Sequence, residues 1–135
     1  MSAVYLLEDN NLVRRYLTEL LRIVGNFEVQ AFDQPQPLLD SLQQSLPQLL
    51  ILDINLADAK VDGESVDGII LSHRIKTQWG SEAPVIMLLS AHAMAGDEQQ
   101  YLQQSLADDY QSKPILDEDA FLDRVRELLA TSAAE

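Results

Sequence analysis

Leu49-Leu50-Ile51-Leu52-Asp53 decides the fold, because an uninterrupted apolar run ends there in a carboxylate. A continuous apolar run, as opposed to an alternating one, is typical of a strand that is covered on both faces of a parallel sheet. Polar residues also follow other strand-like segments: Glu8-Asp9 after Leu7, Ser90 after Leu89, and Lys113-Pro114 shortly after Tyr110. Because the carboxyl ends of parallel strands lie on one edge of the sheet, we expect these four marks to meet in one site.

Strand-like and helix-like patterns alternate five times along the chain. Helical spacing runs from Val13 to Val24 and stops at Gly25, and a second helix opens at Pro35-Gln36-Pro37. The last apolar stripe runs from Phe121 to Leu129, and a frayed end from Ala130 follows. This order predicts an α/β fold, a (βα)5 doubly wound five-stranded parallel sheet of the flavodoxin-like type. Strand order 2-1-3-4-5 is one common solution that we adopt here, although periodicity alone leaves the order open.

Composition indicates one domain, which we place at residues 1–130 with a tail at 131–135. The chain has 135 residues, 47% of them hydrophobic, and no cysteine, so disulfide and thiolate chemistry are excluded. No apolar run approaches the roughly 18 residues of a membrane span, and Ala3 to Leu7 is too short for a signal peptide. We therefore expect a soluble cytoplasmic protein without membrane insertion. The net charge of −13 argues against direct binding to nucleic acid.

The ordered set of polar marks resembles the receiver domain of two-component response regulators. The resemblance covers essentially the whole chain, from Glu8-Asp9 through Asp53 and Ser90 to Lys113-Pro114. The stretch from 84 to 115 is especially similar to receivers attached to hybrid sensor kinases. A lone aspartate or a lone Lys-Pro pair would mean little, so the specificity lies in the four marks taken in order.

This resemblance implies that Asp53 is a phosphoacceptor, which attacks a phosphohistidine on a histidine kinase or histidine phosphotransfer protein. A carboxylate is a competent nucleophile toward phosphoryl groups, and transfer depends mainly on positioning and on charge neutralisation. Ser90 would donate its hydroxyl to the phosphoryl group, and Lys113 would supply a positive charge. The Lys113-Pro114 bond would be cis. The chain would be a signalling phosphoacceptor and no enzyme beyond its own phosphorylation and dephosphorylation.

Convergence of Glu8, Asp9 and Asp53 would need a cation. Two like charges about 4 Å apart repel by roughly 4 kcal/mol at an effective dielectric near 20. A divalent ion relieves this repulsion, and Mg²⁺ (or Mn²⁺) suits a site of carboxylates, waters and a phosphate oxygen. The resemblance adds the backbone carbonyl of Asn55 as a ligand. Two aspartates are commoner than Glu8-Asp9 in this family, but the longer Glu8 can still reach the metal directly or through water.

Switching residues are also implied by the resemblance. Ser90 would move toward the phosphate while Tyr110 turns inward, which would alter the surface of the fourth helix, fifth strand and fifth helix. That surface would bind a downstream target or a second copy in a phosphorylation-dependent homodimer. From its own pattern, Tyr110 is equally an ordinary half-buried strand residue. His92 and Asn55 are candidate modulators of the acyl phosphate, and a solvent-facing loop histidine is the alternative for His92.

Two segments have further consequences. The polar segment 99–104 has only a thin apolar stripe, so we expect the fourth helix to be held weakly. Val-Asp-Gly occurs twice, at 61–63 and 66–68, and we place the start of the third helix at the second copy. The acidic loop 57–67 is then about seven residues longer than is usual. It could hold a second cation or a partner, and composition favours a flexible loop.

Two other classes of function remain as alternatives. One is a phosphate-independent receiver-like interaction module. The other is a phosphohydrolase of the haloacid dehalogenase type, which also uses a strand-end aspartate and Mg²⁺. That chemistry needs an acidic residue two positions beyond Asp53, where Asn55 stands, so the sequence disfavours it.

Overall fold

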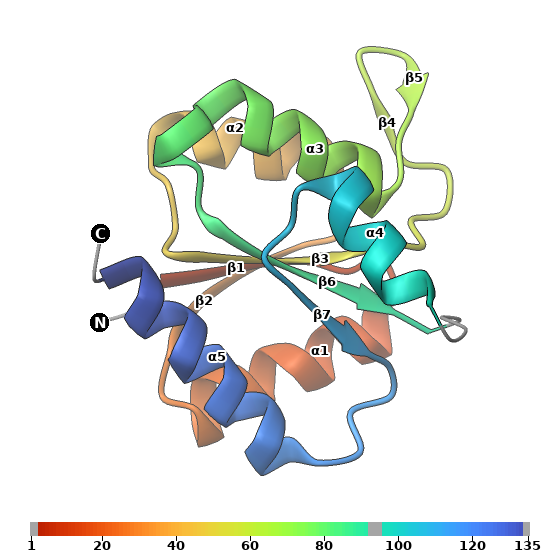
Figure 1. Cartoon of the computed structure of the whole chain (residues 1–135). Helices are drawn as coiled ribbons and strands as arrows, with labels where there is room; N and C mark the ends of the chain where they lie inside the picture. The colour runs from red at the N-terminus through yellow and green to blue at the C-terminus, as the bar shows by residue number, and fades with distance from the viewer. Residues whose placement is uncertain (1–2, 92–95, 134–135) are drawn as a thin grey trace.

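The computed structural model describes residues 3–91 and 96–133. Five parallel strands form one sheet in the order β2-β1-β3-β6-β7 (Figure 1). The strands are β1 (Ala3–Leu7), β2 (Glu28–Phe32), β3 (Leu49–Asp53), β6 (Val85–Ser90) and β7 (Asp109–Ser112). Numbered among themselves, these five strands have the expected order 2-1-3-4-5, which confirms the flavodoxin-like prediction.

Helices cover both faces of the sheet. One face carries α1 and α5, and the other carries α2 and α3, with α4 beside α3 (Figure 1). The bounds are α1 (Asn11–Glu19), α2 (Pro35–Gln44), α3 (Gly68–Trp79), α4 (Asp97–Ser105) and α5 (Glu118–Ala133). α5 continues to Ala133, so the frayed end expected from Ala130 is wrong for the residues that the structure describes. None of the described helices combines the length and the apolar content that a membrane crossing needs.

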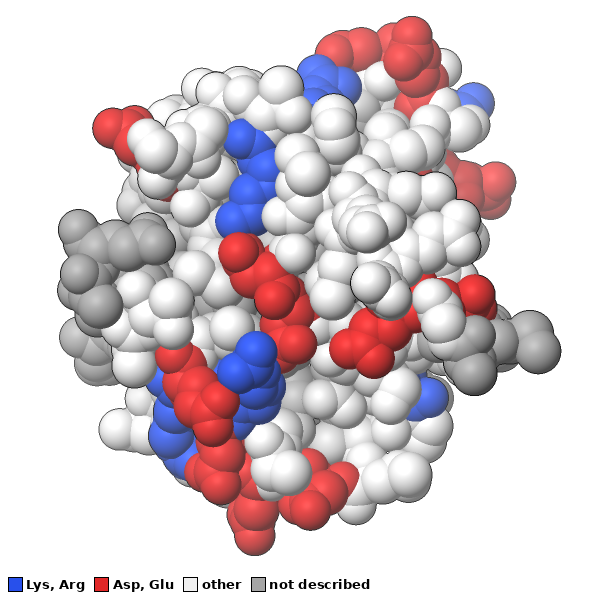
Figure 2. Space-filling model, viewed as in Figure 1, with Lys and Arg blue, Asp and Glu red and all other residues white. Residues whose placement is uncertain are grey.

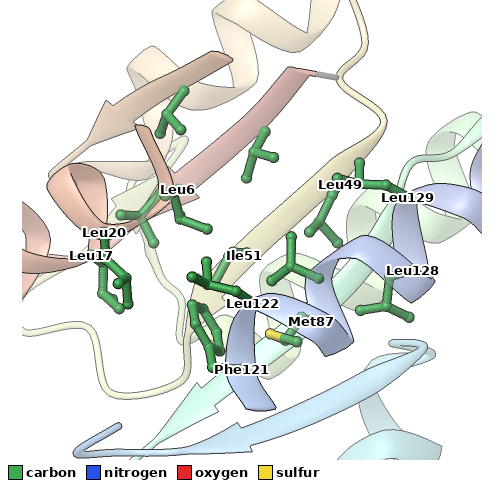
Figure 3. Close-up of a cluster of buried hydrophobic side chains, with 14 of the residues drawn as sticks. Leu6, Leu17, Leu20, Leu49, Ile51, Met87, Phe121, Leu122, Leu128 and Leu129 are labelled. Atoms are coloured by element: carbon green, nitrogen blue, oxygen red, sulfur yellow. The ribbon is translucent and has the colours of Figure 1, made fainter. Parts of the chain in front are cut away.

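The buried strand β3 lies at the centre of two apolar cores. Its alternate side chains point to opposite faces, as the pleat requires. Leu49 and Ile51 join the cluster beneath α1 and α5, where Phe121 and Met87 also lie (Figure 3). Leu50 and Leu52 join the cluster beneath α2 and α3. All five residues of β3 are buried, because helices cover both faces of the strand. This packing fixes the position of Asp53 at the end of the strand.

Local sequence explains how α1 begins and ends. Asn10 caps the helix, because its side-chain oxygen accepts a hydrogen bond from the Val13 amide at 3.0 Å. The helix continues into a π-helical turn, η1 (Leu20–Val24), and stops at the predicted Gly25. A Cβ on Gly25 would lie 2.7 Å from the Phe27 ring and 2.8 Å from the Leu21 carbonyl oxygen. Gly25 is therefore needed for close packing, and the neighbouring Asn26 adopts the left-handed conformation with φ 60°.

The acidic segment after Asp53 forms a small antiparallel hairpin of β4 (Lys60–Val61) and β5 (Glu64–Ser65). Its two-residue turn is Asp62-Gly63, with φ of 52° and 82°, and Asp-Gly favours such turns because both residues tolerate positive φ. The segment is anchored by three buried apolar side chains: Ala59, Val61 and Val66. The structure thus has a hairpin here, projecting beyond α3 in Figure 1, where composition favoured a flexible loop.

Candidate functional site

The carboxyl ends of β1, β3 and β7 border one cavity of about 600 Å³. Its polar end is formed by predicted site residues that are far apart in sequence: Glu8, Asp9, Asp53, Asn55 and Lys113. Its apolar wall comes mainly from α1 and from the connection between β7 and α5: Val13, Tyr16, Leu17, Pro114 and Ile115. The structure therefore brings together the acidic pair, the strand-end aspartate and the lysine, as parallel strands predict.

Asp53 is nearly inaccessible, with 1% of its surface exposed. Its Oδ1 accepts hydrogen bonds from the Asn55 amide at 3.2 Å and from Lys113 Nζ at 3.1 Å. The chain beyond it is pinned in two directions: the Ile54 amide donates to the Leu89 carbonyl oxygen at 2.8 Å, and the Ile54 carbonyl accepts from the Gly68 amide at 3.0 Å. β6 and the start of α3 thus hold the backbone around the carboxylate.

Glu8 is fully buried and is bonded at both carboxylate oxygens. Oε1 accepts from Lys113 Nζ at 2.7 Å, and Oε2 accepts from the Asn10 amide at 3.2 Å. The Arg14 guanidinium also donates to the Glu8 carbonyl oxygen at 3.0 Å. Lys113 consequently bridges two buried carboxylates, Glu8 and Asp53. A buried charge needs such pairing, because desolvation of an unpaired ion is expensive.

Asp9 is partly exposed, and it completes an acidic group of three. Its Oδ2 accepts a hydrogen bond from the Ala57 amide at 2.8 Å, which links it to the chain that leads into the hairpin. Glu8, Asp9 and Asp53 each offer a carboxylate oxygen, and these three atoms lie within 4.8 Å of one another. Hard oxygen donors at this spacing suit Mg²⁺ or Mn²⁺, so the donor set fits the expected metal.

The electrostatics of the site raise the proton affinity of Asp53. Burial comes first and the neighbouring Glu8 second; together they outweigh Lys113 and raise the pKa of Asp53 to about 7. Burial lowers the pKa of Lys113, but its hydrogen bond with Glu8 and the attraction of Asp53 and Glu8 more than compensate, so the pKa of Lys113 is raised. Lys113 therefore stays protonated, while Asp53 titrates near neutral pH in the metal-free protein.

The remaining predicted residues occupy distinct places. Ser90 ends β6 and is buried, and its carbonyl accepts from the Lys113 amide at 2.8 Å. The Lys113-Pro114 bond is cis, which confirms that prediction. Tyr110 is half-buried on β7 with its ring 6.4 Å from that of Tyr101, centroid to centroid. Its hydroxyl is buried without a hydrogen-bond partner in the part of the chain that the structure describes. His92 lies outside the described residues, and Asn55 is exposed at the rim.

Three contributors to this site were not predicted from the sequence. The Arg14 guanidinium donates to the Glu8 carbonyl oxygen, and the Ala57 amide donates to the Asp9 carboxylate. A backbone amide such as that of Ala57 leaves no mark in residue type. Tyr16 lines the cavity and donates its hydroxyl to Glu118 at the start of α5. That hydrogen bond is the main cause that raises the pKa of Tyr16 to about 12, followed by burial. Only the helical register of Tyr16, one turn beyond Val13 and Leu12, could have suggested its place.

The parallel five-stranded sheet, with a group of carboxylates and a lysine at its carboxyl edge, defines a flavodoxin-like α/β domain. The chain belongs to the response regulator receiver domain family, whose model matches residues 4–126. A similar curated protein is the "Protein-glutamate methylesterase/protein-glutamine glutaminase 3" of Rhodospirillum rubrum, 31% identical over 90 residues. The match covers 67% of this chain but only 22% of that protein, so the relative is far longer than the shared domain.

Solved structures of similar fold include several receivers. A BeF3-activated DrrB receiver domain is 21% identical with a TM-score of 0.76, over 96% of this chain and 98% of that chain. A putative response regulator from Chloroflexus aurantiacus J-10-fl is 23% identical with a TM-score of 0.80, over 96% and 98%. A CheY-like receiver domain protein from Methanospirillum hungatei JF-1 is 16% identical with a TM-score of 0.80, over 99% and 98%. At these identities, the likeness establishes the fold.

Proposed function

We propose that the chain is the phosphoacceptor receiver of a two-component phosphorelay, with Asp53 as the acceptor. The observation that carries this proposal is the constellation around Asp53: a buried carboxylate at a cavity, paired with the Lys113 ammonium and adjacent to two further carboxylates. Such an arrangement presents a nucleophile beside a cation that can offset charge on a phosphoryl group. Membership of the receiver family supports the same role.

In the proposed reaction, a carboxylate oxygen of Asp53 attacks the phosphorus of a phosphohistidine on a histidine kinase or phosphotransfer protein. The P–O bond of an acyl phosphate forms, the P–N bond breaks, and its electron pair returns to the imidazole, which takes a proton from solvent. Lys113 would turn from the carboxylates toward the phosphoryl oxygens, and Ser90 would donate a hydroxyl hydrogen bond. Hydrolysis of the acyl phosphate would reset the chain, which would catalyse no other turnover.

The acidic group is proposed to hold Mg²⁺ or Mn²⁺ through Glu8, Asp9, Asp53 and the backbone carbonyl of Asn55. When bound, the ion would supply positive charge that offsets repulsion between the carboxylates and the incoming phosphoryl group. The chain's own contribution is the fixed placement of these ligands. Asp9 is held by the Ala57 amide, and Glu8 is held by the Asn10 amide. His92 and Asn55 are proposed modulators of the lifetime of the acyl phosphate.

Output is proposed to run through the surface of α4, β7 and α5, with Ser90 and Tyr110 as the switch. Tyr110 packs against Tyr101 of α4, so a change at Tyr110 would be felt by that helix. The partners would be a downstream target protein or a second phosphorylated copy, and the compartment would be the cytoplasm. The alternative, an interaction module that takes no phosphate, would keep this surface in one state.

Intact mass after incubation with acetyl phosphate tests the proposal. Wild type should gain one phosphoryl group in the presence of Mg²⁺ and none with a chelator. Asp53→Asn should gain none, while Asp123→Asn, an exposed carboxylate on α5, should behave as wild type. A folded wild-type protein that stays unmodified, beside a control receiver that reacts, would favour the phosphate-independent module.

A further inference from the structure

Helix α4 is held by an unusual residue. Among its nine residues, 97–105, only Ser105 is buried, whereas helices normally use an apolar stripe for this purpose. The prediction that α4 is thinly packed agrees with this burial. Its contacts with the fold therefore include a buried polar residue beside Tyr101, which packs at the edge of the apolar cluster beneath α2 and α3.

The C-terminal end of α4 is bonded to α3 by Ser72. The Ser72 hydroxyl donates to the Ser105 carbonyl oxygen at 2.9 Å, and both serines are fully buried. The last carbonyls of a helix have no partner within the helix, so this donor satisfies a group that would otherwise be buried and unpaired. The Ser105 hydroxyl in turn accepts from the Ala107 amide at 3.1 Å.

A second contact from α3 holds the chain immediately beyond α4. Lys76, one helical turn after Ser72, pairs with Asp108 at 2.7 Å. The same Asp108 oxygen accepts from the Ile86 amide at 2.9 Å, so it also joins β6. α3 thus grips the connection between α4 and β7 at two points. The residue before α4 is Gly96, which has φ 92° and no side chain with which to cap the helix.

We propose that Ser72 is a positioning residue that makes the C-terminal end of α4 the pivot of this helix. The N-terminal end of α4 then moves about that pivot, and Tyr101, whose ring packs against that of Tyr110, carries the movement to β7. The Ser72–Ser105 bond fixes this pivot against α3, so its loss loosens the attachment of the whole helix. The pivot is inferred from the contacts that Ser72 and Lys76 make at the C-terminal end of α4. Only its effect on phosphorylation rests on the proposed function.

Hydrogen exchange of the unphosphorylated full chain tests the pivot directly. Ser72→Ala removes the donor, and amides of residues 101–105 should exchange about fivefold or more faster than in wild type, with β1 and β3 unchanged. Ser72→Cys keeps the size and offers a weak donor, so its exchange should lie between the two. Thr77→Ala, at an exposed position of the same helix, should match wild type.

The second readout separates positioning from general destabilisation. A looser α4 makes the alternative position easier to reach, so Ser72→Ala should take phosphate from acetyl phosphate about two- to threefold faster than Thr77→Ala. Unchanged exchange of α4 in folded Ser72→Ala would overturn the pivot, as would equal acceleration in every element. If Ser72→Ala does not fold, the same comparison in Ser72→Cys decides. Failure of wild type to accept phosphate would overturn the proposed function, and hydrogen exchange alone would then decide whether the pivot exists.

Discussion

Asp53 combines two properties that oppose each other, a reactive position and an expensive burial. The residue is 1% exposed, and its carboxylate lies beside the buried Glu8. Burial and Glu8 raise the pKa of Asp53 from 3.8 to about 7, so the folded protein binds this proton more tightly than the unfolded chain does. Stability should therefore fall as pH rises from about 4 to about 7, since the unfolded state then holds fewer protons at this group.

Replacement of Asp53 by Asn should remove this cost, because the amide has the shape of the protonated acid. Near pH 8, without divalent metal, Asp53→Asn should be more stable than wild type by about 1 to 3 kcal/mol. Near pH 4 the difference should largely vanish, since wild type is then protonated at Asp53 too. Urea unfolding at the two pH values measures both quantities.

Asp123→Asn serves as the control for this measurement, since the Asp123 side chain is 71% exposed. Its difference from wild type should stay within about 0.5 kcal/mol at both pH values. An Asp53→Asn protein with no gain near pH 8 would mean that Lys113 neutralises the buried acids more fully than the pKa of about 7 implies.

Prediction from sequence succeeded for residues that end strands and failed for residues that act through the backbone. Asp53, Lys113 and Glu8 could be placed in one site because parallel strands bring their carboxyl ends to one edge of the sheet, independently of loop conformation. The Ala57 amide could not be placed from the sequence, because almost every residue carries a backbone amide. Ser72 left a readable signal, since it is a polar residue between Leu71 and Ile75 on the buried face of α3. A buried hydroxyl at such a position needs a partner, but its identity required coordinates.

At the scale of elements, one tripeptide has two different uses. In the first Val-Asp-Gly, Asp62-Gly63 makes the hairpin turn, and a Cβ on Gly63 would meet nothing within 4 Å. In the second, Asp67 caps α3, because its side-chain carboxylate accepts a hydrogen bond from the Ile70 amide at 2.8 Å. A Cβ on Gly68 would lie 2.2 Å from the Asp53 carbonyl oxygen. The same tripeptide therefore gives a turn in one place and a close backbone contact beneath Asp53 in the other.

The same substitution at the two glycines should give unequal results. Gly63→Ala forces a side chain into positive φ and should cost about 1 kcal/mol of unfolding free energy. Gly68→Ala must push α3 away from the end of β3 and should cost about 3 kcal/mol or more. Denaturant unfolding compares them, and phosphorylation of folded Gly68→Ala should also slow, because Asp53 is displaced. Equal costs at both positions would contradict the close approach.

The hairpin makes a further prediction at this scale. Composition pointed to a flexible loop because four acids lie in it, but three apolar residues among them supply the anchor. Val61 is 2% exposed, so Val61→Ala should lower the unfolding free energy by about 1 to 2 kcal/mol. Lys60→Ala, one residue earlier on the exposed side, should change it by less than about 0.5 kcal/mol. If both substitutions change the unfolding free energy only slightly in urea, the segment would be better described as a flexible loop.

At the scale of the whole molecule, negative charge dominates. The net charge is −13, and acidic side chains are spread over much of the face in Figure 2. Three of the carboxylates gather at the proposed site, where Lys113 is the cation that pairs with Glu8 and Asp53 among the described residues. Screening by salt acts weakly on buried charges, whereas a bound divalent ion acts on them directly.

Mg²⁺ should therefore stabilise the fold beyond any effect of ionic strength. A ligand that binds only the folded state at about ten times its dissociation constant adds about 1.4 kcal/mol to the unfolding free energy. We expect a gain of this size near pH 7.5 in wild type, relative to NaCl of matched ionic strength. The gain should be much smaller in Asp9→Asn, which loses one carboxylate of the group but can keep its hydrogen bond from Ala57. It should also shrink near pH 5, where protons compete for Asp53, whose metal-free pKa is about 7. Equal stabilisation of wild type by Mg²⁺ and by NaCl would contradict a metal ion held by Glu8, Asp9 and Asp53. Charge screening would then account for the whole effect.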